Sequence, residues 1–274
     1  MHSEVHSGVD AEWTRSGQGS ALWRGHGQTG EMSLETDRIP GLRDLFWVRT
    51  DVPGSEVVAV DENAVDEHTV SDRTADELGV VEHVGHVERV GHRMRGSQHA
   101  IDPVPYALTY ELWTDTSWAT TRLIAHNEGA GWTRDLELLR SGDGWKCEVD
   151  AVGNPGLASF DGSGIRDPAP PGAHNLTSIH SAIDIDIGGS PLTNSLPVQR
   201  LGLLSAEPGE LTELVSAWVL PPTLEVVASA QTYTALGGHR VRYGDFATGV
   251  DVEYGSDGWV SVYPGLARRV MGSA

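Results

Sequence analysis

The sequence is poor in cysteine and lysine. Its 274 residues include one cysteine, Cys147, and one lysine, Lys146, beside eighteen arginines. A single cysteine excludes an internal disulfide and any metal site built from several cysteines. We interpret Cys147 as a small buried hydrophobic residue. Without disulfides, the cytoplasm is the simplest location for the protein.

Long apolar runs are also missing. No stretch of eighteen apolar residues occurs, so the sequence predicts no transmembrane helix and no membrane-embedded protein. The first twenty residues, MHSEVHSGVDAEWTRSGQGS, show no basic region followed by an apolar one. We therefore expect no secretory signal.

Positive charge is scarce throughout. The chain has 39 acidic and 19 basic residues, for a formal net charge of −20. Between Asp51 and Glu82, Arg73 is the only arginine or lysine. Such a surface repels phosphate backbones, which disfavours binding to nucleic acid or to anionic membranes. An acid-rich, lysine-poor surface suits high salt, where charges are screened, so we interpret the chain as adapted to a halophilic setting.

The chain divides into two segments by hydrophobic pattern. Residues 1–42 are polar and rich in glycine, and we predict a mostly disordered leader there. From Leu45 onward, apolar and polar residues alternate with the period of strands. Turns at residues 141–144 and 255–258 predict two hairpins. The prediction is one mainly β domain of antiparallel strands over residues 43–270.

Signals for helices are few. The best is Pro208–Ser216, where apolar residues follow a Pro-Gly start at helical spacing. The continuation to residue 236 is interpreted as two strands separated by Pro221-Pro222. Val57–Val60 and Val84–Val90 are further predicted strands. Residues 160–175, rich in proline and glycine, form a predicted long loop that is either disordered or a lid.

The histidines do not predict a metal site. His83, His86 and His92 are separated by three and six residues. A separation of three places two side chains on opposite faces of a strand, so both cannot easily bind one zinc ion. No serine lies in a nucleophile elbow after a strand, and no glycine-rich phosphate loop opens a helix. We expect no metal and no cofactor.

Asp184 and Asp186 lie in the segment DIDI and share one face of a predicted strand. The alternating residues Ile183, Ile185 and Ile187 are predicted to fill the core. Three interpretations of the aspartates stay open: a solvated or hydrogen-bonded face, a ligand-lining pair, and the paired carboxylates of a glycoside hydrolase.

The residues after this strand predict a turn. Gly188-Gly189 permits positive φ, and Pro191 and Pro197 restrict the geometry of the exit. Asn194 is explained as a turn residue. Arg200 is placed in a following alternating strand, where it is expected to pair with Asp184 or Asp186.

Tryptophan is abundant among the aromatic residues. The chain has nine tryptophans and only three phenylalanines. Rings with a polar tip suit the wall of a site for amphiphiles, and they also suit an ordinary core.

Four blocks of residues carry a resemblance to a known family. They are YALTYELWTDTSWATTRL, the segment Asp184–Leu203, the pair Ala217-Trp218 with Pro222 and Gln231-Thr232-Tyr233, and Arg242-Tyr243 with Phe246 and the YPGL of residues 263–266. In order and spacing over roughly residues 45–268, the chain resembles the glycolipid-binding family whose members adopt the spiral β-roll fold. It departs from the family pattern at Ser190, Leu192 and Gln199.

The resemblance implies one long antiparallel sheet wound as a spiral β-roll around a single central helix. It also implies a homodimer and a likeness to the carriers that ferry lipoproteins across the bacterial periplasm. Pro208–Ser216 is the candidate for the central helix.

Three functions follow as hypotheses. The first is a non-catalytic binding protein for a glycolipid or similar amphiphile in a Trp/Tyr-lined cavity. The alternatives are a structural or interaction protein without a ligand, and a glycoside hydrolase that uses Asp184 and Asp186. The cavity wall is predicted from Trp113, Trp118, Trp218, Tyr233 and Tyr243, and the polar contacts from Asp184, Asp186, Asn194, Arg200, Gln231 and Arg242.

Overall fold

The computed structural model describes the backbone of residues 13–15, 20–25, 28–33, 42–76, 79–142, 144–157, 169–244 and 248–270. The chain separates into two units, Met1–Pro40 and Gly41–Ala274. In the first unit, β1 (Trp13–Arg15), β2 (Ser20–Gly25) and β3 (Gln28–Ser33) pair as a three-stranded antiparallel sheet. These strands lie inside the predicted leader and were not anticipated. The leader's other residues, most of the predicted loop over residues 160–175, and Phe246 lie outside the described part of the chain.

The second unit is built on one sheet of fourteen strands. Its order is β10-β9-β8-β7-β6-β5-β4-β17-β16-β15-β14-β13-β12-β11. All neighbouring strands pair antiparallel except β11 and β12, which are parallel. The strands are β4 (Leu42–Arg49), β5 (Gly54–Asp76), β6 (Gly79–Ala100), β7 (Tyr106–Asp115), β8 (Thr120–Gly129), β9 (Trp132–Ser141), β10 (Gly144–Val152), β11 (Asp184–Ile187), β12 (Leu211–Leu220), β13 (Glu225–Gly237), β14 (Arg240–Tyr243), β15 (Val250–Tyr254), β16 (Val260–Tyr263) and β17 (Ala267–Arg269).

The mainly β prediction is confirmed, as are both hairpins. β9 and β10 pair across the predicted turn, and β15 and β16 pair across the second. The strands predicted at Val57–Val60 and Val84–Val90 lie in β5 and β6. The predicted break at Pro221-Pro222 separates β12 from β13.

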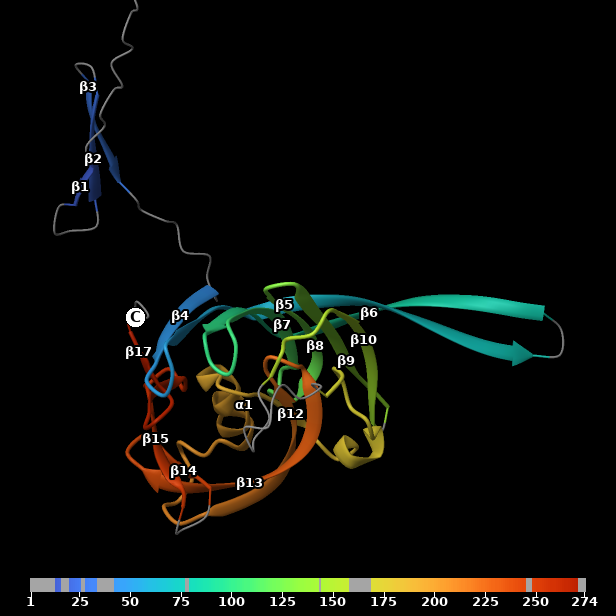
Figure 1. Cartoon of the computed structure of the whole chain (residues 1–274). Coiled ribbons are helices and arrows are strands. Elements are labelled where there is room, and N and C mark those ends of the chain that lie inside the picture. The colour runs from blue at the N-terminus through green and yellow to red at the C-terminus, as the bar shows by residue number, and fades with distance from the viewer. Residues whose placement is uncertain are drawn as a thin grey trace, which may run out of the picture. The chain divides into compact units, whose positions relative to one another are not determined.

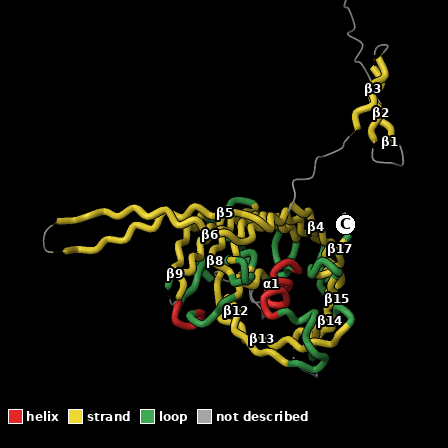
Figure 2. The backbone as a smooth tube through the Cα atoms, turned by 180° about the vertical axis from the view of Figure 1, so that it is seen from behind, coloured by secondary structure: helices red, strands yellow, loops and turns green. Residues whose placement is uncertain are grey.

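β5 and β6 are longer than their neighbours. β4 pairs with β5 only as far as Asp61, and β7 pairs with β6 only from Gly91. The remaining residues of β5 and β6 pair with each other up to Asp76 and Gly79. Figure 2 shows the result, a two-stranded ribbon that extends beyond the rest of the sheet. His83 and His86 belong to this ribbon, and their side chains lie outside the described part of the chain. The absence of a metal site at these histidines stays a prediction.

The helix lies in a different place from the predicted one. α1 (Pro191–Leu201) is the one α-helix of the described residues. These residues also include the short 3-10 helix η1 (Leu176–Ile179). In Figure 1 the sheet curves around α1 from β4 through β17 and β15 to β12. The turn predicted for Pro191–Pro197, and the strand predicted for Arg200, were therefore wrong. Pro191 occupies the first helical position, where its missing N–H costs nothing, and Gly202 ends the helix at φ 64°.

The helix predicted at Pro208–Ser216 was also wrong, because residues 211–220 form β12. This strand is hydrogen-bonded on both sides, to β11 and to β13. Leu211 is 58% exposed, so the apolar residues at helical spacing do not form one buried face. Pairing along both edges outweighs a weak local helical preference.

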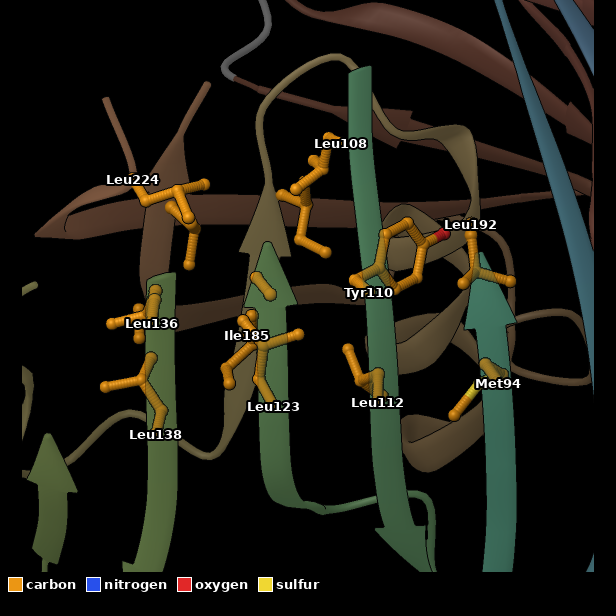
Figure 3. Close-up of a cluster of buried hydrophobic side chains, with 14 of the residues drawn as sticks. Met94, Leu108, Tyr110, Leu112, Leu123, Leu136, Leu138, Ile185, Leu192 and Leu224 are labelled. Carbon is orange, nitrogen blue, oxygen red and sulfur yellow. The ribbon is translucent and has the colours of Figure 1, made fainter. Parts of the chain in front are cut away.

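The core fills the space between the sheet and α1. Tyr106, Leu108, Tyr110 and Leu112 alternate along β7, and all four are buried, as their period of two predicts. Figure 3 shows Leu108, Tyr110 and Leu112 of β7 beside Leu123, Leu136 and Leu138, with Ile185 and Leu192 facing them. The predicted winding as a spiral stays a prediction.

Cys147 in β10 is half-buried and packs against the edge of this core. Burial raises the pKa of its thiol.

Candidate functional site

The segment that joins β11 to α1 positions the polar side chains of the interior. Gly189 adopts φ 78°, and Ser190 is the residue before the helix. The N–H of Ile187 donates to Thr193 Oγ1 at 3.1 Å, which fixes the start of α1 against the end of β11. The aspartates of β11 and the polar residues of α1 therefore face each other.

Asp184 forms a buried ion pair with Arg200. Arg200 Nε donates to Asp184 Oδ1 at 3.0 Å, and Arg200 Nη2 donates to Asp184 Oδ2 at 2.5 Å. Asp184 is 1% exposed, and the Arg200 side chain is 14% exposed. The predicted pairing of Arg200 with one of the two aspartates is present, made from the last turn of a helix.

Asp186 is hydrogen-bonded to two different side chains. Thr193 Oγ1 donates to its Oδ1 at 3.0 Å, and Gln231 Nε2 donates to its Oδ2 at 2.7 Å. Burial raises the pKa of Asp186 above its ordinary value, against the effect of these two donors. Gln231 Oε1 in turn accepts from Ser216 Oγ and from the hydroxyl of Tyr233, at 2.9 and 3.1 Å. Both aspartates are thus bonded inside the protein.

The ring contacts of the predicted aromatic residues are separate from one another in the structure. Tyr233 and Tyr243 make an edge contact at 5.3 Å beside α1. Trp118, between β7 and β8, stacks on His92 with ring centroids 3.6 Å apart. Trp113 is buried in β7 and Trp218 is 37% exposed in β12.

Asn194 and Arg242 lie apart from each other. Asn194 is buried in α1, and its Oδ1 has no hydrogen bond within the described residues. Its backbone carbonyl accepts from the Tyr254 hydroxyl. Arg242 in β14 bonds Asp251 Oδ1 at 2.6 Å on the solvent side of the sheet. That bond lowers the pKa of Asp251.

Three of the hollows among the described residues are well formed, and Trp113, Trp118, Trp218, Tyr233 and Tyr243 line none of these three. The largest of these three, about 720 Å³, is a mostly apolar hollow at the ends of β5 to β8. The smallest, about 280 Å³, lies beside the C-terminus of α1. The third, about 530 Å³, is the most polar, and we call it the polar groove.

Of these three hollows, the polar groove is the one that includes a predicted ligand residue, Arg200. It lies where β7 ends, β8 begins and β9 ends. Its lining residues are Asp115, Ser117, Ala119, Thr120, Thr121, Arg140, Gly142, Ile183 and Arg200. It therefore combines Arg200, fixed by Asp184, with one further arginine, one carboxylate and several hydroxyls.

Asp115 organises the turn at one side of the polar groove. Its Oδ1 accepts from the backbone N–H and the hydroxyl of Ser117 at 2.8 and 2.6 Å, and from the N–H of Ala119 at 3.0 Å. Its Oδ2 has no hydrogen bond within the described residues. On the other side, the Arg140 guanidinium lies 6.0 Å from the Trp145 ring centroid. The groove thus offers both an acceptor and a donor to a ligand.

Two important residues were not found from the sequence. Arg140 carries no local signal, because the groove forms only when β9 meets the start of β8 and the end of α1. Glu56 of β5 was one acid within an acidic segment, yet it is fully buried against Tyr110 and Ser190. Its burial depends on the path of β5 through the core.

Among the described residues, no group of three or more histidine, cysteine, aspartate or glutamate side chains is arranged to hold a metal ion. Within the same part of the chain, no helix is long and apolar enough to cross a membrane.

No curated protein matches the chain. Among solved structures, it is similar to a DUF1089-family protein from Pseudomonas aeruginosa, with 26% identity, 65% of this chain and 86% of that chain covered, and a TM-score of 0.49. A family model described as "Putative glycolipid-binding" matches residues 72–269, which is most of the chain, and the protein therefore belongs to this family.

Proposed function

We propose that the protein is a non-catalytic binding protein for a glycolipid or a similar amphiphile, whose head group occupies the polar groove. The observation that carries the proposal is the groove itself, where Asp184 holds Arg200 in place. Beside Arg200 the groove is lined by Asp115 and Arg140. The spiral winding of the sheet, a homodimer and a cytoplasmic location complete the proposal.

The groove matches the chemistry of a sugar. Each sugar hydroxyl donates one hydrogen bond and accepts others, so a sugar site needs fixed acceptors beside fixed donors. Asp115 Oδ2 is the acceptor, and the guanidinium N–H groups of Arg140 and Arg200 are the donors. Because the three hydrogen bonds to Asp115 Oδ1 hold the carboxylate still, little side-chain freedom is lost when a ligand binds.

The aspartates of β11 support binding rather than hydrolysis. A glycoside hydrolase needs two carboxyl groups that flank the scissile bond. Neither Asp184 nor Asp186 lines any of the three hollows. The carboxylate oxygens of Asp184 accept hydrogen bonds from Arg200, and those of Asp186 accept from Thr193 and Gln231.

A soluble glycolipid mimic tests the proposal. Octyl β-galactoside, used below its critical micelle concentration, is titrated into the protein by calorimetry. We expect saturable binding, and we expect Thr121→Val to weaken it about fivefold because one hydroxyl of the groove is lost. Thr109→Val is the control, because Thr109 is exposed in β7 and does not line the groove.

Two results would contradict the proposal. One is the absence of saturable binding for this glycoside and for a panel with other sugars. The other is an equal loss of affinity in Thr121→Val and Thr109→Val. Release of octanol during the titration would show that the protein is an enzyme.

A further inference from the structure

Most arginines in the described part of this acidic protein are paired with carboxylates. Eight of those in the described part form ion pairs with carboxylates: Arg43, Arg49, Arg93, Arg95, Arg122, Arg200, Arg242 and Arg269. This is expected in a chain with 39 acidic and 19 basic residues, since each cation has many acids available.

Arg140 is different, because it faces a hollow instead of a carboxylate. It has no ion pair and no hydrogen bond within the described residues, and its one ring contact is with Trp145 at 6.0 Å. Alternation along β9 places it on the same face as the buried Leu136 and Leu138. Arg140 therefore lies near the C-terminal end of β9, on the face of the sheet that carries the core, in the wall of the polar groove.

Arg200 adds a second cationic group to the same wall. Its Nε and Nη2 bond Asp184, and its Nη1 has no hydrogen bond within the described residues. Because the pair with Asp184 is bidentate, the guanidinium plane is fixed. Arg200 is thus a preoriented donor, whereas the charge of Arg140 is paired with no carboxylate of the described residues.

We infer that the polar groove recognises an anionic group, a sulfate, phosphate or carboxylate, carried by the head group of its ligand. The inference rests on the proposed function for the lipid and the sugar, and on Arg140 for the charge. The anion binds Arg140 and the free edge of Arg200, and the sugar hydroxyls bind Asp115 on the opposite side. Planar guanidinium groups suit the oxygens of such an anion, and they lose less hydration than lysine would.

Three probes separate the charge from the sugar and from a free anion. They are octyl β-galactoside, the same compound with a 3-sulfate, and inorganic sulfate. Calorimetry at fixed ionic strength measures each with the wild type, with Arg140→Gln and with Arg140→Lys. Arg240→Gln is the control, because it removes the same charge from an exposed residue of β14 outside the groove.

We expect the sulfated glycoside to bind about tenfold more tightly than the neutral one. Arg140→Gln should abolish this tenfold difference while the neutral glycoside keeps its affinity, and Arg140→Lys should retain part of it. Arg240→Gln changes the net charge by the same amount as Arg140→Gln, so long-range repulsion is matched between the two variants, and Arg240→Gln should keep the tenfold difference. Thermal unfolding of Arg140→Gln near the wild-type temperature shows that the variant is folded.

The other outcomes are distinct. Equal binding of the two glycosides by the wild type overturns the inference and leaves the proposed function standing. Tighter binding of the sulfated compound that survives Arg140→Gln also overturns it, because the anion then binds elsewhere. Binding of inorganic sulfate, lost in Arg140→Gln, without binding of either glycoside supports the anion site and contradicts the proposed function.

Discussion

The hydroxyl of Ser190 donates to Glu56 Oε1 at 2.6 Å, which joins the N-cap of α1 to the start of β5 across 134 residues of sequence. The hydroxyl of Tyr110 donates to the same oxygen at 2.6 Å. Glu56 is fully buried, and its Oε2 has no hydrogen bond within the described residues. Burial, opposed by these two donors, raises the pKa of Glu56 from an ordinary 4.5 to about 7.

This raised pKa predicts that the protein loses stability as the pH rises from about 5 to about 7.5. The folded state holds the Glu56 proton more tightly than the unfolded chain does. The contribution is therefore complete below pH 4.5 and is lost as the pH passes through about 7. Urea unfolding at several pH values measures the free energy of unfolding. Relative to the wild type, that of Glu56→Gln should rise by on the order of 3 kcal/mol across this range.

The matched control for Glu56 is Glu253→Gln, because Glu253 is exposed in β15. Its difference from the wild type should stay constant with pH. Parallel pH profiles for the wild type and Glu56→Gln would show that Glu56 is ionised throughout the range, against the prediction.

Much of the sheet was predictable because its strands alternate strictly. β7 places Leu108, Tyr110 and Leu112 on one buried face, and this pattern is visible in the sequence. α1 was missed for a physical reason. Residues 191–198 are all buried, so the helix has no polar face and no helical period in its hydrophobicity. Pro197 inside it also resembles a helix breaker.

The candidate site was predictable only where its parts are close in sequence. Asp184 and Arg200 are sixteen residues apart, and their opposite charges suggested a pair. Arg140 is brought to the same groove by the packing of β9 against β8, which no local pattern encodes. The aromatic residues were grouped by type alone, and the fold distributes them among separate contacts.

The ion pair of Asp184 with Arg200 should contribute strongly to stability. Arg200→Gln leaves a carboxylate that is 1% exposed without its cation. We expect the free energy of unfolding to fall by about 3–5 kcal/mol. Adding Asp184→Asn should recover part of the loss, and chemical denaturation of the double-mutant cycle measures the coupling.

The comparison for this cycle is Arg122→Gln. Arg122 pairs with Glu137 at 2.8 Å, but their side chains are 24% and 32% exposed. An exposed pair contributes little, so this variant should lose less than about 1 kcal/mol. Equal losses for Arg200→Gln and Arg122→Gln would mean that the buried pair has no special role.

Trp118 should act in folding more than in ligand binding. It adopts φ 68°, which is unusual for a bulky residue, and its ring lies between His92 and the buried Trp259. We expect Trp118→Ala to lower the free energy of unfolding by about 2 kcal/mol or more. Trp218→Ala should cost less than half of that, because Trp218 is 37% exposed. The reverse order of the two melting temperatures would contradict this assignment.

Gln231 should stabilise the ionised form of Asp186. Its Nε2 donates to Asp186 Oδ2 at 2.7 Å, and its Oε1 accepts from Ser216 and Tyr233. Gln231→Leu removes a donor from a buried carboxylate, so we expect a loss of about 2–4 kcal/mol near neutral pH. The loss should shrink at acid pH, because the neutral carboxyl group needs that donor less. Thr232→Val, the next residue on the opposite face of β13, should show no such pH dependence in urea unfolding. A loss in Gln231→Leu that is equal at pH 4.5 and pH 7.5 would show that Asp186 keeps one protonation state in the folded protein.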